Sequence, residues 1–119
     1  MRTALILAVA AGLGASSMTR AATVEVFVFN FDFSVNMPGS GPVEDAVIFE
    51  GDTVRWVWLT GLHSVTSVVG SSESFDSDLL LPPSTFEYTF SNAGTYAYYC
   101  ITHGSDNGDG TFDGMGGYV

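Results

Sequence analysis

The 119-residue sequence contains no lysine and only three arginines, against 13 Asp and Glu residues. Phosphate backbones and anionic lipid surfaces are bound by clustered Lys and Arg, so the composition argues against nucleic acid and anionic membranes as partners. Charged residues make up 13% of the chain and aromatic residues another 13%, which is too apolar for a disordered acidic tail. The length leaves no room for a multidomain enzyme, so we expect a single folded domain.

The N-terminal segment predicts export. A charged start is followed by the apolar run 4–13 and then by small residues, as in a secretory signal peptide. The run is too short to cross a bilayer as a helix. Cleavage after Ala21 is expected because it places Thr19, rather than Arg20, at the third position before the cut. We therefore expect residues 1–21 to be a signal peptide, with an uncleaved lipid or membrane anchor as the alternative.

The exported domain, residues 22–119, would hold all 13 acidic residues and one strong cation, Arg55, which gives a formal charge of −12. Its location would be periplasmic, lumenal or extracellular, without membrane insertion. The single cysteine, Cys100, cannot form an internal disulfide. An unpaired thiol is a liability in an oxidising compartment unless it is used or shielded.

Apolar residues alternate with a period of two, which is typical of strands. Val54, Trp56 and Trp58 are expected to point inward, and no helical period persists for 10 residues beyond the signal segment. The predicted strands are residues 23–33, 47–49, 53–58, 63–69, 85–90 and 95–100. Short strands joined by close turns predict an all-β fold, an antiparallel Greek-key β-sandwich or barrel.

Four residues carry the chemistry. His63 follows a turn, Cys100 ends a predicted strand, His103 comes three positions later, and Met115 lies in a glycine-rich stretch. Two imidazoles, a thiolate and a thioether form a soft ligand set that suits copper in a trigonal site with a weak axial bond. Zinc gains little from a thioether, and a binuclear thiolate-bridged copper site needs a second cysteine.

The sequence resembles the cupredoxins, small blue copper proteins of the plastocyanin, pseudoazurin and amicyanin type. The motifs that carry the resemblance are VIFEGDTVRW (47–56), LHSVTS (62–67), FDSDLL (75–80) before TFEYTF (85–90), and GTYAYYCITHG (94–104). The resemblance implies one type 1 copper ion with equatorial ligands His63, Cys100 and His103 and an axial ligand at Met115. It also implies an electron carrier rather than an enzyme, and a small acidic carrier is most simply a monomer.

The positions of these residues in the sequence suggest a role for each ligand. His63 would be the more buried imidazole, and His103 would face solvent as the electron port, with Leu62 and Ile101 as an apolar docking rim. The acidic charge would steer a basic redox partner, such as a cytochrome with a lysine patch. Solubility or adaptation to salt explains the same charge equally well.

The sequence departs from the family pattern in two places. Eleven residues separate His103 from Met115, so residues 105–113 look like an insertion. A site without Met115 would be three-coordinate or would use a backbone carbonyl such as that of Gly61. The sequence also ends at Val119, which implies either a short final strand or an incomplete domain.

Other functions are compatible with parts of the sequence. The same fold could serve as a copper carrier or storage protein, and a metal-free secreted sandwich could act in adhesion. A Cys100–His103 thiol hydrolase lacks any further triad or oxyanion motif. The inserted loop has oxygen-bearing residues at calcium-loop spacing, but Gly116 stands where the bidentate Glu belongs, so a solvated acidic loop is the simpler interpretation.

Overall fold

The computed structural model describes residues 2–3, 8–13 and 21–119. Strands β1 (Arg2–Thr3) and β2 (Ala8–Leu13) form a small parallel pair. Most of the predicted signal peptide lies outside the described residues, so its prediction stays untested. Among the described residues, no helix is long and apolar enough to cross a membrane.

The first sheet of the domain has the strand order β4-β3-β5-β7. Its strands are β3 (Thr23–Phe29), β4 (Asp32–Ser34), β5 (Thr53–Trp58) and β7 (Thr85–Thr89). β3 pairs in parallel with β5, whereas β4 and β7 pair antiparallel with their neighbours. Because β3 and β5 run in the same direction, the residues that follow them meet at one end of the sheet.

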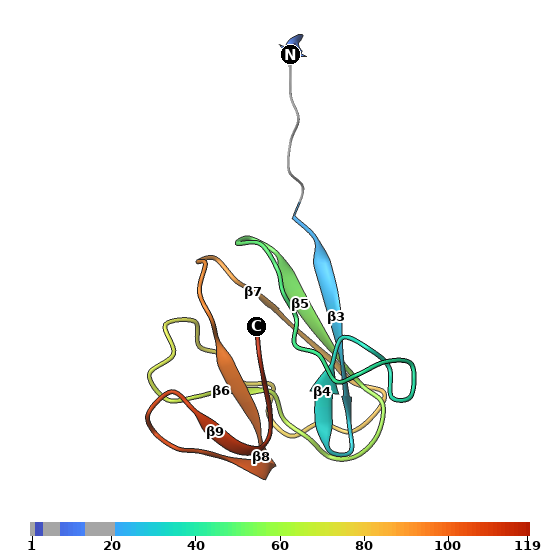
Figure 1. Cartoon of the computed structure of the whole chain (residues 1–119), viewed down its shortest axis with the longest axis vertical. Coiled ribbons are helices and arrows are strands. Elements are labelled where there is room, and N and C mark those ends of the chain that lie inside the picture. The colour runs from blue at the N-terminus through green and yellow to red at the C-terminus, as the bar shows by residue number, and fades with distance from the viewer. Residues whose placement is uncertain (1, 4–7, 14–20) are drawn as a thin grey trace.

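The second sheet has the order β6-β8-β9 and packs beside the first (Figure 1). Its strands are β6 (Thr66–Ser67), β8 (Ala97–Asp106) and β9 (Phe112–Tyr118), all paired antiparallel. The prediction of an all-β sandwich is confirmed. Within the two sheets of residues 21–119, the parallel β3–β5 pair is the exception to the expected antiparallel arrangement.

The core lies between the two sheets and contains the residues that the period-two apolar pattern predicted to point inward. Val54 and Trp56 are fully buried and Trp58 is 2% exposed, as predicted. Trp56 contacts Phe75 and Tyr98 at ring-centroid distances of 5.7 and 5.3 Å. Aromatic pairs at such distances add to the stabilisation from burial alone, so these rings serve the core.

Three predicted strands differ from the structure. The chain reverses after β3, so residues 23–33 form β3 and β4 joined by a tight turn rather than one strand. Residues 47–49 do not pair with a neighbouring strand, so they are not part of either sheet. Val47 is 91% exposed. Of residues 63–69, only β6 is strand, since His63 makes a single isolated bridge with Leu80.

The inserted segment 105–113 is a β-hairpin rather than a loose loop. Ser105 pairs with Asp113 and Asp106 with Phe112, which extends β8 and β9 outward. The register shifts between Tyr99 and Gly104, so the residues between them bulge from the ladder. This bulge contains the predicted ligands Cys100 and His103.

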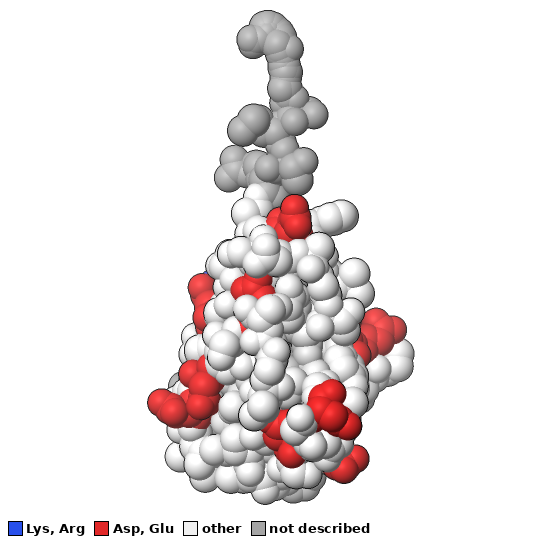
Figure 2. All heavy atoms as spheres, turned by 90° about the vertical axis from the view of Figure 1, so that its left-hand side faces the viewer, with Lys and Arg blue, Asp and Glu red and all other residues white. Residues whose placement is uncertain are grey.

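Acidic side chains are spread over the surface rather than gathered in one patch on the face shown in Figure 2. The strong cation of the described domain, Arg55, is bound by Glu87 at 2.6 Å and by Glu25 at 3.4 Å. These hydrogen bonds and charges raise the pKa of Arg55. The domain therefore presents a surface of net negative charge.

Candidate metal centre

Three of the four predicted ligands meet in one cluster. The Nδ1 atoms of His63 and His103 are 3.1 Å apart. The Sγ atom of Cys100 lies 3.7 Å from the first of these nitrogens and 3.6 Å from the second. Among the described residues, this is the one group of His, Cys, Asp and Glu side chains whose ligand atoms approach closely enough to share a metal ion.

The size of this triangle fits a first-row transition metal. A point equidistant from the three atoms lies about 2.0 Å from each, the circumradius of a triangle with these sides. Imidazole nitrogens bind zinc at about 2.0–2.1 Å and thiolates at about 2.3 Å, and first-row metals of similar size need comparable distances. Two nitrogens and one thiolate in a trigonal arrangement are the donor set of type 1 copper sites.

His63 is held from both sides of its backbone. It follows β5 and exchanges backbone hydrogen bonds with Leu80 at 3.1 and 2.9 Å, and its carbonyl accepts a bond from the indole N–H of Trp58 at 3.1 Å. Its side chain has no exposed surface. Burial, followed by the nearby His103, lowers the pKa of His63, which favours the neutral imidazole that a metal requires.

Asn30 fixes the orientation of the His63 ring. The Oδ1 atom of Asn30 lies 2.8 Å from Nε2 of His63. Since this oxygen can only accept, Nε2 carries the proton and the Nδ1 lone pair points toward the cluster. Hydrogen bonds of this kind orient metal-binding histidines and raise their basicity.

Gly61 makes room for this contact. A Cβ atom at this position would lie 2.2 Å from Oδ1 of Asn30 and 2.5 Å from Nε2 of His63. Its φ of +84° also lies in the left-handed region that favours glycine. Both steric space and backbone conformation therefore require glycine here.

Cys100 is fully buried, and two polar groups of the protein contact its sulfur. The backbone N–H of Ser64 points at its sulfur at 3.5 Å, and the hydroxyl of Thr102 lies 3.1 Å from the same atom. The Ser64 hydroxyl accepts the N–H of Ile101 at 3.0 Å and so ties the His63 segment to the Cys100 segment. Such bonds stabilise a thiolate and tune the potential of a metal bound to it.

His103 is the exposed member of the cluster. The ring of Phe31 lies against it at a centroid distance of 4.8 Å and approaches His63 at 6.2 Å. Phe31 is itself 61% exposed, and Leu62 and Ile101 are 42% and 46% exposed. The structure thus brings His103 to the surface beside apolar side chains, as the sequence predicted.

Met115 is buried on β9 and belongs to the same core cluster as Cys100. Gly114 pairs with Gly104, and Gly116 pairs with Tyr99. The intervening Met115 therefore lies opposite the bulge that carries Cys100 and His103. The 11 residues between His103 and Met115 form a hairpin whose two arms pair with each other. The chain therefore comes back beside its starting point, and Met115 lies opposite the bulge in spite of the long interval in the sequence.

The calcium interpretation of the inserted segment gains no support. The Asp106 carboxylate accepts backbone N–H groups from Gly108 and Val69, at 2.8 and 2.7 Å. Asp109 accepts both the N–H and the hydroxyl of Thr111, at 3.0 and 2.6 Å, and these bonds lower its pKa. The acidic side chains stabilise turns within the hairpin.

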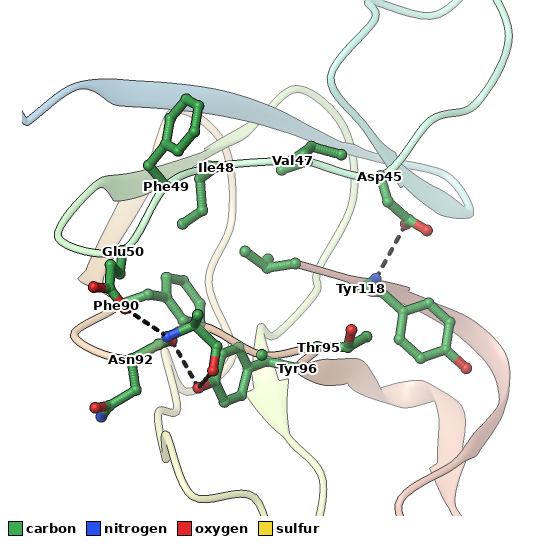
Figure 3. A pocket seen from close by; sticks show the side chains of 14 residues that line it. Asp45, Val47, Ile48, Phe49, Glu50, Phe90, Asn92, Thr95, Tyr96 and Tyr118 are labelled. Carbon is green, nitrogen blue, oxygen red and sulfur yellow. Dashed lines mark hydrogen bonds between the residues drawn. The ribbon is translucent and has the colours of Figure 1, made fainter.

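A cavity of about 380 Å³ lies away from the cluster (Figure 3). Val47, Ile48 and Phe49 form one wall, with Phe90 and Tyr96 opposite. None of the four predicted ligands lines this cavity.

Sequence reasoning missed several residues of the site. Asn30 and Phe31 were assigned to a strand, although they form the turn that contacts both histidines. Thr102 and Ser64 were not singled out. One usable signal was Asn30 itself, a polar residue that ends the otherwise apolar series formed by Val24, Val26 and Val28.

No protein-family model matches the sequence. Among solved structures, the chain is similar to the Cu(I) form of a mutant of amicyanin, with a TM-score of 0.54, 22% identity, and coverage of 87% of this chain and 84% of that chain. An oxidised amicyanin mutant gives a TM-score of 0.55 at 22% identity, with coverage of 82% and 79%.

A copper-containing nitrite reductase from Thermus scotoductus gives a TM-score of 0.55 at 22% identity. The match covers 95% of this chain but only 26% of the reductase, so the likeness is confined to part of that enzyme. With two β-sheets packed as a sandwich and amicyanin among its structural neighbours, the chain has the cupredoxin fold.

Proposed function

We propose that this protein is an exported electron carrier that holds one type 1 copper ion. The observation that carries the proposal is the triangle of two imidazole nitrogens and one sulfur, with edges of 3.1, 3.6 and 3.7 Å. Bound copper would supply a one-electron couple, Cu(II)/Cu(I). One of the similar amicyanin structures is a Cu(I) form and the similar nitrite reductase contains copper, which supports the choice of metal.

Each ligand would have a distinct task. His63, fixed by Asn30, gives the site a ligand that stays in place in both oxidation states. Cys100 supplies the thiolate, and His103 links the site to the surface. Because Asn30, Ser64 and Thr102 contact the donor side chains and restrict their movement, little rearrangement would accompany electron transfer, which favours fast exchange.

The first test is reconstitution of residues 22–119 with Cu(II). We expect an intense blue colour from the thiolate–copper bond and its loss in Cys100→Ser. A matched control is Ser105→Ala, which changes an exposed residue of the same strand. A colourless copper complex of the unmutated protein would overturn the proposal.

Met115 is proposed as the axial ligand, because it is buried opposite the bulge. A weak axial ligand tunes the potential without being needed for binding. We therefore expect Met115→Gln to remain blue while its midpoint potential falls. An unchanged potential would favour a backbone carbonyl, such as that of Gly61, or a three-coordinate site.

The proposed partner is a basic redox protein that docks around His103. The negative surface would accelerate the encounter, and the rate would fall as ionic strength rises. Stopped-flow oxidation of the reduced protein by a cytochrome with a lysine patch measures this rate at several salt concentrations. Tight Cu(I) binding combined with slow exchange would instead indicate a copper carrier or storage protein.

A further inference from the structure

The buried carboxylate of Asp52 lies where the exported chain is expected to begin. Asp52 is only 6% exposed. Its Oδ1 atom accepts the backbone N–H of Ala22 at 2.8 Å, and its Oδ2 atom accepts the N–H of Phe49 at 3.1 Å. The backbone of Asp52 is also held, because its carbonyl accepts the N–H of Phe90 at 3.0 Å.

No cation contacts this carboxylate within residues 21–119. The single arginine of that range, Arg55, is bound to Glu25 and Glu87. A buried charge is costly unless it is paired, and two neutral N–H donors compensate it only in part. The position of Asp52 therefore favours a positive group next to Ala22.

The sheet begins at the same point. Thr23 is the first residue of β3 and pairs with Thr53, and the N–H of Thr53 donates to the carbonyl of Ala22 at 2.9 Å. Ala21 and Ala22 are both exposed, so the bond between them is accessible. Removal of Ala22 would delete both of its hydrogen bonds, whereas a cut before it would keep them.

We propose that hydrolysis of the Ala21–Ala22 peptide bond creates an α-ammonium group that forms an ion pair with Asp52. Water adds across the bond, leaving a carboxylate on Ala21 and an amine on Ala22, which is protonated at neutral pH. The peptidase would be of the class that cuts after a small residue during export. Maturation would thus supply the cation that Asp52 lacks within residues 21–119.

The proposal rests on the export part of the proposed function and is independent of copper. Its test is a four-member cycle of metal-free proteins. The chain begins at Ala22 or is extended by Ala21, and each form carries either Asp52 or the Asp52→Asn substitution. Glu25→Gln in both chain lengths is the matched control. Glu25 is an exposed acid on β3, the strand that follows Ala22, but it does not contact Ala22.

We expect the chain that begins at Ala22 to melt roughly 3 °C or more above the extended chain when Asp52 is present. The difference should disappear with Asp52→Asn and persist with Glu25→Gln. An equal difference in both backgrounds, or no difference with Asp52, would overturn the ion pair. If Asp52→Asn does not fold, Asp52→Glu replaces it, and the difference should shrink because the longer side chain misplaces the carboxylate.

Mass spectrometry of the exported protein tests the position of the cut. A mature chain that starts at Ala22 supports the proposal, and one that starts at Thr23 overturns it, since the nitrogen bound by Asp52 is then gone. A chain that retains residues 1–21 overturns the cleavage step, and with it the proposal. The blue colour of the copper form tests the metal site separately, so the two failures are distinguishable.

Discussion

Buried polar side chains lie at both ends of the first sheet, and they differ in how their hydrogen-bonding atoms are satisfied. At the end where β7 finishes, the Glu73 carboxylate is 5% exposed and accepts the Tyr88 hydroxyl at 2.7 Å. It also accepts the N–H of Ser91 at 3.0 Å and two N–H groups of Asn92, at 2.9 and 3.1 Å. At the opposite end, His63, Cys100 and His103 direct potential metal-binding atoms at one another.

The difference separates a structural cluster from a functional one. Glu73 has four donors for its two oxygens, so its hydrogen-bonding capacity is met within the protein. The two nitrogens and the sulfur are mutual neighbours at 3.1–3.7 Å, and a shared cation would satisfy all three at once. Buried polar groups with a complete set of partners stabilise the fold, whereas grouped acceptors indicate a binding site.

The largest expected effect concerns the hydrogen bond between Asn30 and Nε2 of His63. Asn30→Ala removes the acceptor for Nε2 of His63 and should lower copper affinity by about 10–100-fold. The potential should rise, because a less basic imidazole stabilises Cu(II) less. Competition with a chelator measures the affinity, and Asn107→Ala in the exposed hairpin is the control.

In the metal-free protein, NMR should show the Nε2–H tautomer of His63 before the substitution and a mixture after it. Unchanged affinity with a single tautomer would contradict this role.

The second prediction concerns the saturated cluster. Glu73→Gln should lower the melting temperature by roughly 5 °C or more at pH 7 while the copper spectrum stays unchanged.

The stability difference should also depend on pH. The Tyr88 hydroxyl, followed by the Asn92 and Ser91 donors, lowers the pKa of Glu73 below its ordinary 4.5. The stabilisation is therefore fully present above pH 4.5 and is lost as the pH falls through the lower, folded-state pKa. The difference between the two proteins should shrink in that range. Glu44→Gln, at an exposed acid, is the control, and an equal effect there would argue against the network.

The smallest expected effect concerns the exposed side of the metal centre. Phe31→Ala removes an apolar ring from His103, and the more polar surroundings should favour Cu(II) and lower the midpoint potential. A threefold shift in the Cu(I)/Cu(II) ratio corresponds to about 28 mV for one electron. Cyclic voltammetry measures the shift. Phe49→Ala is the control, since Phe49 is 78% exposed and lines the distant cavity. A shift of the same size in both variants would contradict a local effect.

Much of the fold followed from residue alternation. The inward positions Val54, Trp56 and Trp58 were predicted because a period of two decides which side chains enter the core. Turn geometry was harder to predict, because the apolar series 23–33 continues through the reversal between β3 and β4. The polar Asn30 interrupts the apolar face at that point, but it does not show which distant residues the turn will contact, so the contacts of Asn30 and Phe31 with the histidines could not be foreseen.

The site was predictable to the extent that ligand types are rare. One cysteine and two histidines occur in the whole chain, and all three lie in the cluster. Their supporting contacts involve common residues, such as Ser64 and Thr102, which are recognisable only once distant segments are placed together. Residue identity indicates metal ligands, whereas the hydrogen bonds that tune them depend on the three-dimensional arrangement.

The hairpin between His103 and Met115 has a consequence for recognising such sites. Residues added to both arms of a hairpin change the chain length in steps of two and leave the base of the hairpin in place. Gly104 and Gly114 form that base here. Ligand spacing along the chain can then vary widely while spacing in the fold stays constant. A motif defined by a fixed interval would overlook this methionine, whereas strand register places it opposite the bulge that carries Cys100 and His103.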